Sequence, residues 1–305
     1  MPTTLPLRPK QGRGETVRNP CLEPAMSDCQ HLIDAQSLRA DPDCLVFDCR
    51  FNLAAPGWGR RIYREGHIPG ACYADLDLDL SRPIGPDTGR HPLPDVAELA
   101  HKLGAWGLDR TVRAVVYDDA GGAFAARLWW LLRWFGHPHV ALLDGGLQSW
   151  LASGGTLSTK PTTPTPRTFL PQIDERAWVS TADLVAGLAA DRLQVIDARA
   201  PARFSGESEP IDPVAGHIPG AINLPLQGNL DADGRFLPPG QLRARFTAAL
   251  GDRPSATVVH SCGSGVNACH NLLAMEAAGL TGSHLYAGSW SEWIRDPRRP
   301  VARGV

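Results

Sequence analysis

Two stretches of this chain are identical: Gly66-His67-Ile68-Pro69-Gly70-Ala71 and Gly216-His217-Ile218-Pro219-Gly220-Ala221. An apolar run that ends in Asp-x-Arg precedes each of them, Cys44–Arg50 before the first and Leu193–Arg199 before the second. A repeat at such long spacing indicates a duplicated domain rather than a solenoid of short units. We therefore predict that the chain consists of two copies of one module.

Two further stretches continue the repeat. Val115–Asp119 aligns with Val258–Cys262, and Leu142–Trp150 aligns with His284–Trp293. In this alignment Asp119 stands opposite Cys262, so that one copy keeps a thiol and the other does not. A thiol with a purely structural role would not be expected opposite a charged carboxylate.

The alternation of apolar runs with helical patterns predicts the fold class. The apolar runs lack polar alternation, which is typical of strands covered on both faces. We predict an α/β fold with two tandem domains side by side, each a mostly parallel sheet flanked by helices. In the second module we expect helices over Thr181–Ala190, Pro239–Leu250 and Ala268–Ala278, and strands over Leu193–Asp197, Thr257–Ser261 and Ser283–Tyr286.

Shifts in composition predict the domain boundaries. Residues 1–27 are polar and rich in proline, which is typical of a disordered tail. Residues 156–174 begin with a run of Thr and Pro that predicts a semi-rigid linker. We therefore expect the first domain over 28–155 and the second over 175–305.

Composition excludes several classes of protein. The chain has 305 residues, of which 43% are hydrophobic and 20% charged, and its net charge is −2. These values are typical of a globular protein and give no basic field for nucleic acid or a membrane surface. No apolar stretch approaches a membrane span of ~20 residues. We expect neither nucleic acid nor membrane as a partner.

The cysteines predict the compartment. There are seven cysteines, with no Cys-x-x-Cys pair, which fits neither a disulfide framework nor a zinc site. The first residues also lack the apolar core of a secretory signal. We expect a cytoplasmic protein with mostly buried thiols, among them Cys269, and no zinc site.

Cys262 has a different sequence context from the other cysteines. The segment Cys262–Ala268 (Cys-Gly-Ser-Gly-Val-Asn-Ala) follows a predicted strand and opens a predicted helix. The carboxyl end of a parallel strand is where α/β domains bind ligands. Gly263 and Gly265 allow the backbone N–H groups to converge on an anion, and the helix amino terminus adds positive potential. We predict that Cys262 reacts as a thiolate and that the loop holds a negatively charged adduct on its sulfur.

A cysteine phosphatase would use a loop of similar geometry. Such an enzyme needs an arginine six residues after the cysteine to bind the phosphate in a bidentate manner. Here that position is Ala268, and the loop contains no arginine. The sequence therefore disfavours phosphoester chemistry.

At this point the chain resembles the tandem-domain rhodaneses, which are sulfurtransferases, over roughly residues 28–299. Tyr63–Ala71 resembles the family's amino-terminal signature and Tyr286–Trp293 its carboxy-terminal one. The resemblance implies an inactive first domain and covalent catalysis in the second, with no metal or organic cofactor. A donor loads a sulfur onto Cys262, and a thiol or cyanide acceptor then removes it. Thioredoxin or a small thiol would serve as the acceptor.

The loop sequence favours one small anionic donor. Mercaptopyruvate-type members have Cys-Gly-Ser-Gly-Val-Thr, which this chain matches through Val266, whereas thiosulfate-type members have Cys-Arg-Lys-Gly-Val-Thr. The resemblance implies 3-mercaptopyruvate as donor, with thiosulfate as the alternative. It also implies that Ser264 and His67 assist proton transfer and that Arg203 binds the donor. The loop residues Gly263, Gly265, Val266 and Asn267 complete the predicted site.

Structural alternatives stand beside these roles. The Ser264 hydroxyl could only brace the turn, and His67 could only fix a turn, because His217 repeats it in the second module. Arg50 and Arg199 also repeat and are interpreted as structural. A protein-fed persulfide carrier with little turnover of small donors is the alternative to an enzyme.

Three positions depart from the mercaptopyruvate pattern. Asp212 stands where a second substrate arginine is expected, nine residues after Arg203. Asn267 replaces the usual loop threonine. A relay of Ser264 and His67 would need an acid shortly before His67, where only Glu65 is available.

Overall fold

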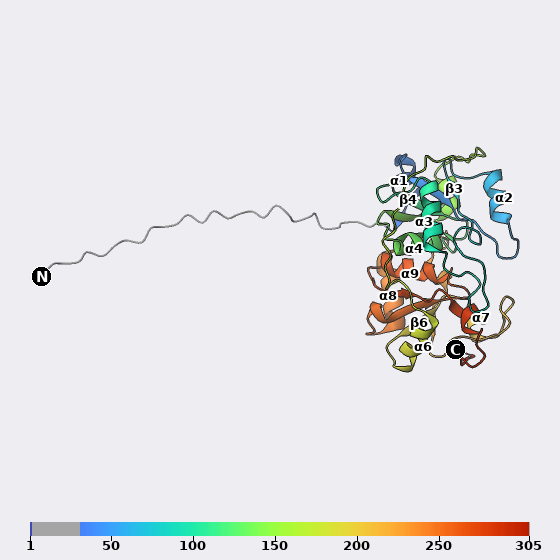
Figure 1. The fold of residues 1–305 in the computed structure, drawn as a ribbon, viewed down its shortest axis with the longest axis vertical. Coiled ribbons are helices and arrows are strands. Elements are labelled where there is room, and N and C mark those ends of the chain that lie inside the picture. The colour runs from blue at the N-terminus through green and yellow to red at the C-terminus, as the bar shows by residue number, and fades with distance from the viewer. Residues whose placement is uncertain (2–30, 305) are drawn as a thin grey trace.

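The structure is a computed structural model, and it describes residue 1 and residues 31–304. The tail predicted over 1–27 lies outside the described residues except for Met1. Figure 1 shows the remaining chain as two domains along the long axis, the first coloured blue to green and the second yellow to red.

Each domain is built on a parallel sheet. The first sheet has five strands in the order β1-β5-β4-β2-β3, and the second has four in the order β7-β6-β8-β9. Every strand pair in both sheets is parallel. The strands are β1 Leu32–Ile33, β2 Leu45–Asp48, β3 Cys72–Tyr73, β4 Ala114–Tyr117, β5 Val140–Leu143, β6 Gln194–Asp197, β7 Ile222–Asn223, β8 Val258–Ser261 and β9 His284–Leu285.

Helices cover both sheets, and several begin at side-chain caps. Asp34 and Asp95 each accept two backbone N–H groups, and Ser180 forms a capping box with Asp183. The helices of the first domain are α1 Ala35–Ala40, α2 Trp58–Glu65, α3 Val96–Ala105, α4 Ala125–Trp134 and α5 Gly146–Ala152. Those of the second are α6 Thr181–Ala189, α7 Pro201–Ser205, α8 Pro239–Leu250, α9 Ala268–Ala277 and α10 Ser289–Trp293, with 3₁₀ turns at Leu226–Asn229 and Ser255–Thr257.

The strand register corrects one detail of the repeat alignment. Asp48 pairs with Tyr117 in the first sheet, and Asp197 pairs with Ser261 in the second. The residue opposite Cys262 is therefore Asp118, and the prediction of Asp119 was wrong by one position. The physical reason is that the first-domain loop carries one more residue before its helix than the second-domain loop does.

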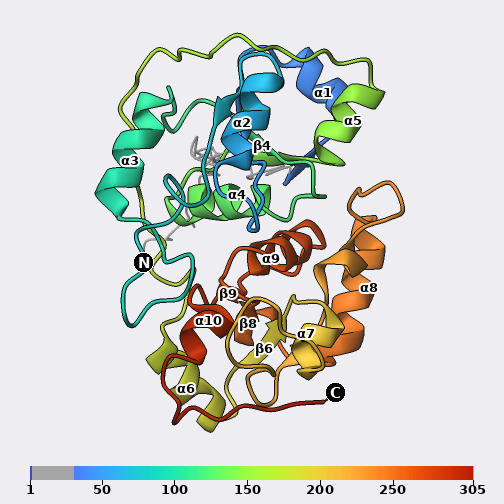
Figure 2. The ribbon, with the colours of Figure 1, turned by 90° about the vertical axis from the view of Figure 1, so that its right-hand side faces the viewer.

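One hydrophobic cluster spans both domains, and each domain has a second cluster of its own. Helices α4 and α9, which follow the two equivalent loops, pack against each other between the sheets (Figure 2). A single hydrophobic cluster extends from Trp129 and Leu128 in α4 to Leu272 and Met275 in α9. Burial of this joint surface fixes the relative position of the two loops.

The segment between the domains wraps around the first domain rather than crossing directly. It carries no helix, and in Figure 2 it runs from α5 past α3 to α6. Backbone hydrogen bonds attach it to the first domain: Ser158 pairs with His67, and Gln172 N–H donates to Phe135. Within the part of the chain that the structure describes, no helix has the length and apolar character needed to cross a membrane.

Candidate active site

Cys262 lies at the carboxyl end of the inner strand β8, directly before the loop that leads into α9. Its side chain is buried, and its Sγ accepts the Gly265 N–H at 3.2 Å. The Cys262 N–H donates to Ser289 Oγ at 3.0 Å, which ties the residue to the first residue of α10. A sulfur anion at this position is therefore hydrogen bonded by the backbone at the amino end of a helix.

Gly265 is required by the shape of this loop. Its φ is +78°, and a Cβ atom there would lie 2.3 Å from the carbonyl oxygen of Ala287. A side chain would thus meet backbone that cannot move aside, in a conformation that L-residues disfavour. Glycine at this position allows the N–H to point at the Cys262 sulfur.

A cavity of about 260 Å³ opens onto Cys262, and both domains line it. Of the residues predicted for the site, Cys262, Gly263, Ser264, Val266, Asn267 and Arg203 lie in its wall. The first domain contributes Phe51, Leu53, Leu76, Arg90, His91 and Phe124. The first domain thus contributes apolar side chains together with one cation and one imidazole, and the second domain contributes the cysteine loop and Arg203.

Ser264 contacts a histidine that the sequence analysis did not identify. Its Oγ lies 2.7 Å from His91 Nδ1, and His91 Nε2 lies 3.3 Å from Asp77 Oδ1. Burial lowers the pKa of His91, and the hydrogen bond to Asp77 opposes that shift. A neutral ring that donates to Asp77 through Nε2–H leaves Nδ1 free to accept the serine proton.

His67 does not reach the site, so its pairing with Ser264 was wrong. Its Nδ1 lies 2.7 Å from the Tyr63 carbonyl, its Nε2 lies 3.1 Å from the Lys160 carbonyl, and its ring stacks on Tyr63. His217 repeats this arrangement with the Phe204 carbonyl and ring. Each imidazole is held by the carbonyl and the ring of one helix residue, Tyr63 of α2 or Phe204 of α7, so that both histidines brace the turn of the repeated hexapeptide.

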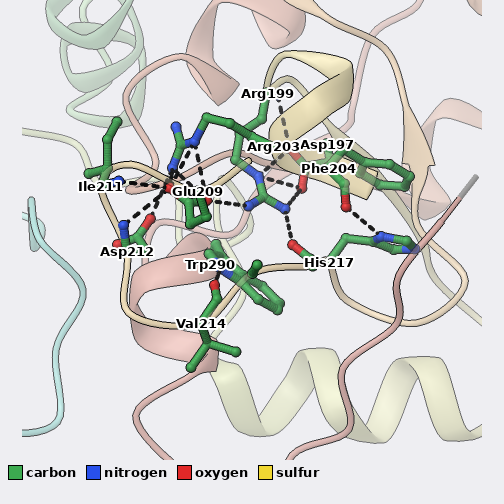
Figure 3. Close-up of polar contacts among 12 residues, drawn as sticks. Asp197, Arg199, Arg203, Phe204, Glu209, Ile211, Asp212, Val214, His217 and Trp290 are labelled. Carbon is green, nitrogen blue, oxygen red and sulfur yellow. Dashed lines mark hydrogen bonds and ion pairs between the residues drawn. The ribbon is translucent and has the colours of Figure 1, made fainter. Parts of the chain in front are cut away.

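Arg203 lies at the mouth of the cavity among carboxylates. Figure 3 shows its guanidinium facing Glu209 and Asp212. Its Nη2 lies 2.8 Å from Glu209 Oε1 and 3.0 Å from Asp212 Oδ2. Asp212 also holds Arg90 of the first domain, with 2.6 Å between Oδ1 and Nη1. The acidic residue that replaces the expected second arginine therefore joins two other arginines.

The repeated Arg50 and Arg199 have structural roles in their own domains. Each makes a bidentate ion pair with the aspartate two residues before it and donates to the carbonyl that precedes the repeated histidine. Their donors are thus used within each domain (Figure 3 shows Arg199 with Asp197).

A buried cation lies beneath the loop. Arg127 of α4 is fully buried; it donates to the carbonyls of Gly265 and His91, and no described residue forms an ion pair with it. Burial lowers the pKa of Arg127, and the Cys269 and Cys262 sulfurs oppose this shift. Burial also raises the pKa of Cys269 to about 12, so that this thiol stays protonated in the core, as predicted.

The first domain carries the same loop with its anion site filled. The Asp118 carboxylate accepts the N–H groups of Ala120, Gly122, Phe124 and Ala125, all at 2.8 Å. A carboxylate held by four backbone donors satisfies the nest that a sulfur anion would otherwise occupy. This domain has neither a nucleophile nor a free anion site there.

Each domain places one loop against the strand–loop–helix region of the other domain. Arg90 N–H donates to Ser291 Oγ, and in the reverse direction Phe236 N–H donates to Asp144 Oδ1. The segments Gly89–Leu93 and Gly234–Pro238 are themselves a short repeat, with Phe236 one place after the arginine, where the first copy has His91. This asymmetry is the signal that could have identified His91, since only one copy carries the imidazole, just as only one copy carries the thiol.

Among the described residues, no group of His, Cys, Asp and Glu side chains could hold a metal ion.

Comparison with known proteins agrees with this geometry. The profile of the rhodanese-like domain matches residues 32–153 and again 180–296. A protein of Pseudomonas aeruginosa named probable 3-mercaptopyruvate sulfurtransferase is 56% identical over 284 residues, which is 92% of this chain and 100% of the relative. A putative thiosulfate sulfurtransferase of Mycobacterium tuberculosis is 40% identical and covers 89% of this chain and 95% of its own length.

A solved structure supports the same assignment. The 3-mercaptopyruvate sulfurtransferase from Leishmania major superposes with a TM-score of 0.77 at 30% identity, covering 87% of this chain and 75% of that one. The predicted fold of two tandem, mostly parallel α/β domains is confirmed. The chain belongs to the rhodanese-like family of sulfurtransferases, with two domains of the family in tandem.

Proposed function

We propose that this enzyme carries sulfur on Cys262 from a small anionic donor, with 3-mercaptopyruvate preferred, to a thiol or cyanide. The observation that carries the proposal is the hydroxyl–imidazole–carboxylate chain of Ser264, His91 and Asp77 beside the Cys262 sulfur. Such a chain supplies proton transfer next to a nucleophile. Of the donors considered, only 3-mercaptopyruvate needs it.

In the first half-reaction the Cys262 thiolate attacks the donor's sulfur. An S–S bond forms, the bond from sulfur to C3 of mercaptopyruvate breaks, and its electron pair stays on the pyruvate enolate. The thiol proton of the donor passes through Ser264 and His91 to C3, giving pyruvate and a Cys262 persulfide anion. The two negative charges at the start are both present at the end, and no oxidant is needed.

Thiosulfate is the alternative donor. Attack on its outer sulfur breaks an S–S bond and releases sulfite, with no proton to place. The acidic Asp212 at the expected second arginine supports this alternative, while the uncharged loop residues Gly263 and Ser264 favour mercaptopyruvate. The two donors thus differ in whether they need the Ser264–His91 chain.

In the second half-reaction an acceptor thiol attacks the outer sulfur of the persulfide. The S–S bond breaks, Cys262 leaves as thiolate and the acceptor becomes the persulfide. We propose thioredoxin or a small thiol as acceptor, and a cytoplasmic location, since free thiols fit a reducing compartment. We further propose the boundaries 28–155 for the inactive domain, 156–174 for the linker and 175–305 for the catalytic domain.

Mass spectrometry of the intact protein tests this function. Reduced protein is mixed with each donor alone, without acceptor, and the mass is followed with time. We expect one added sulfur atom on the native chain and none on Cys262→Ser, with faster loading from 3-mercaptopyruvate. A Cys269→Ser variant is the matched control, because burial keeps that thiol protonated.

Each outcome decides between the candidates. Faster loading from thiosulfate would make thiosulfate, and not 3-mercaptopyruvate, the preferred donor. No loading from either donor would overturn the enzyme and favour a carrier that receives sulfur from another protein.

A further inference from the structure

Arg90 of the first domain is held firmly at the mouth of the catalytic cavity. Its backbone N–H donates to Ser291 Oγ at 2.9 Å, and a Cβ on the preceding Gly89 would lie 2.5 Å from the Gly288 carbonyl. Arg295 anchors the same segment by donating to the Thr88 carbonyl. The guanidinium is therefore presented to the second domain by a docked loop, and its side chain remains 20% exposed.

The free ends of two guanidinium groups converge over the loop. Arg90 uses Nη1 for Asp212, and Arg203 uses Nε and Nη2 for Glu209 and Asp212. Arg90 Nη2 and Arg203 Nη1 have no hydrogen-bond partner in the described part of the chain. A methyl group on Gly263 would lie 3.1 Å from the first of these nitrogens and 3.5 Å from the second. Both guanidinium groups therefore lie against Gly263, the residue next to Cys262.

We propose that Arg90 is a donor-binding residue, which with Arg203 clamps the donor's carboxylate from two domains. Two N–H donors from different sides match the two oxygens of a carboxylate. Asp212 then acts as the positioning residue for both guanidinium groups: its Oδ1 lies 2.6 Å from Arg90 Nη1 and its Oδ2 lies 3.0 Å from Arg203 Nη2. The missing second arginine of the catalytic domain is thereby replaced from the other domain. This inference rests on the proposed function.

Donors with and without a carboxylate test the clamp. For Arg90→Gln we expect kcat/KM with 3-mercaptopyruvate to fall roughly 10- to 100-fold, mainly through KM, because a charge-assisted hydrogen bond is lost. With mercaptoacetone, which has a methyl group in place of the carboxylate, we expect little change. An equal loss with both donors, or no loss with either, would overturn the proposal.

Three variants separate donor binding from a structural ion pair. Arg61→Gln is the matched control, because Arg61 is an exposed arginine that pairs with Glu65 on the surface of α2, and it should leave the activity with both donors unaffected. Arg90→Lys should restore part of the affinity. In Arg90→Gln combined with Asp212→Asn, the loss should persist. Full recovery in that double variant would mean that Arg90 only neutralises Asp212.

Binding of pyruvate to the Cys262→Ser variant separates this proposal from the proposed function. Calorimetry should show pyruvate binding that weakens when Arg90→Gln is added, whether or not the native enzyme loads sulfur. If the native chain forms a persulfide and pyruvate binding ignores Arg90, then the clamp fails while the sulfur chemistry stands. If no persulfide forms but pyruvate binding weakens in Arg90→Gln, then the sulfur chemistry fails while the clamp stands.

Discussion

In the proposed mechanism, the hydroxyl of Ser264 acts through the imidazole of His91, which it contacts. A serine alone neither accepts nor delivers a proton near neutral pH, whereas a neutral imidazole does both. His91 meets the geometric requirement with 2.7 Å to the serine oxygen, and Asp77 fixes its tautomer from the other side. Burial lowers the pKa of His91, which keeps the ring neutral and able to accept a proton.

Replacement of His91 should separate the two donors. For His91→Asn we expect sulfur loading from 3-mercaptopyruvate to slow by about 100-fold or more, the usual range for lost acid–base catalysis. Loading from thiosulfate should change little, since it moves no proton. Rapid-quench mass measurements with each donor read both rates directly.

The matched control is His67→Asn, which removes the histidine of the repeated hexapeptide. This buried ring braces a turn of the first domain, so that the variant should lower the melting temperature. At equal folded fraction it should load each donor at the native rate for that donor. A selective loss of mercaptopyruvate loading in this variant, and not in His91→Asn, would contradict the assignment of the proton relay.

At the scale of elements, the strand–loop–helix unit around Cys262 depends on one backbone conformation. Gly265 has φ +78° and lies against the Ala287 carbonyl, while Gly220 has φ +77° and open space, with no atom within 4 Å of where a Cβ would lie. The two glycines have nearly the same φ and differ in what a side chain would meet. They therefore separate the cost of the conformation from the cost of the contact.

Alanine at these two glycines should have unequal effects. Gly220→Ala should cost about 1–2 kcal/mol of unfolding free energy, the penalty of a left-handed conformation. Gly265→Ala should cost a further ~1–3 kcal/mol, because the methyl group overlaps the backbone. It should also slow persulfide formation, since the Gly265 N–H no longer points at Sγ. Denaturant melts and donor loading measure the two effects, and equal costs would contradict the close contact.

Elements were easier to predict than the contacts between them. The helix expected over Pro239–Leu250 has those bounds, and the strand expected over Thr257–Ser261 begins one residue later, at Val258. Such elements are encoded by local periodicity, caps and glycine stops. The cysteine loop was likewise found from its local context.

The partners of the loop were not predictable in the same way. Ser264 and His91 are 173 positions apart, and nothing in the local pattern of either segment reports that they meet. The sequence analysis chose His67 because it lies in the repeated hexapeptide, whereas His91 lies outside the stretches that were aligned. Arg90 escaped notice since its role depends on how the two domains dock.

At the scale of the whole molecule, buried histidines make the joined domains sensitive to acid. His270 of α9 lies at the domain interface, where its Nε2 donates to the Gly121 carbonyl and its Nδ1 accepts from Asn229. Burial lowers the pKa of His270 to about 4, and that of His260 to about 3. Because the unfolded chain binds these protons near pH 6.5, stability is lost as pH falls from there toward the folded pKa.

The free energy of unfolding should therefore decline between pH 6.5 and 5. Each buried neutral histidine contributes a slope of about 1.4 kcal/mol per pH unit in that range. The variant His270→Gln should have a shallower slope by about that amount, whatever its stability at pH 7. Urea unfolding at half-unit pH steps measures the slope, and an unchanged slope in the variant would show that His270 titrates alike in both states.

The exchange of loops between the domains bears on how such a molecule can be built. A lone module would lack the segment that closes its cradle and could complete it only from a second copy, as in a homodimer with two-fold symmetry. Fusion of the copies into one polypeptide keeps the contribution of a loop by each domain to the other, and it allows the two copies to differ in sequence. One has replaced its nucleophile with Asp118, and the other carries Phe236 in place of an imidazole. The chain therefore resembles an asymmetric dimer in which one domain supplies the thiol, the other supplies the imidazole, and both line a single cavity.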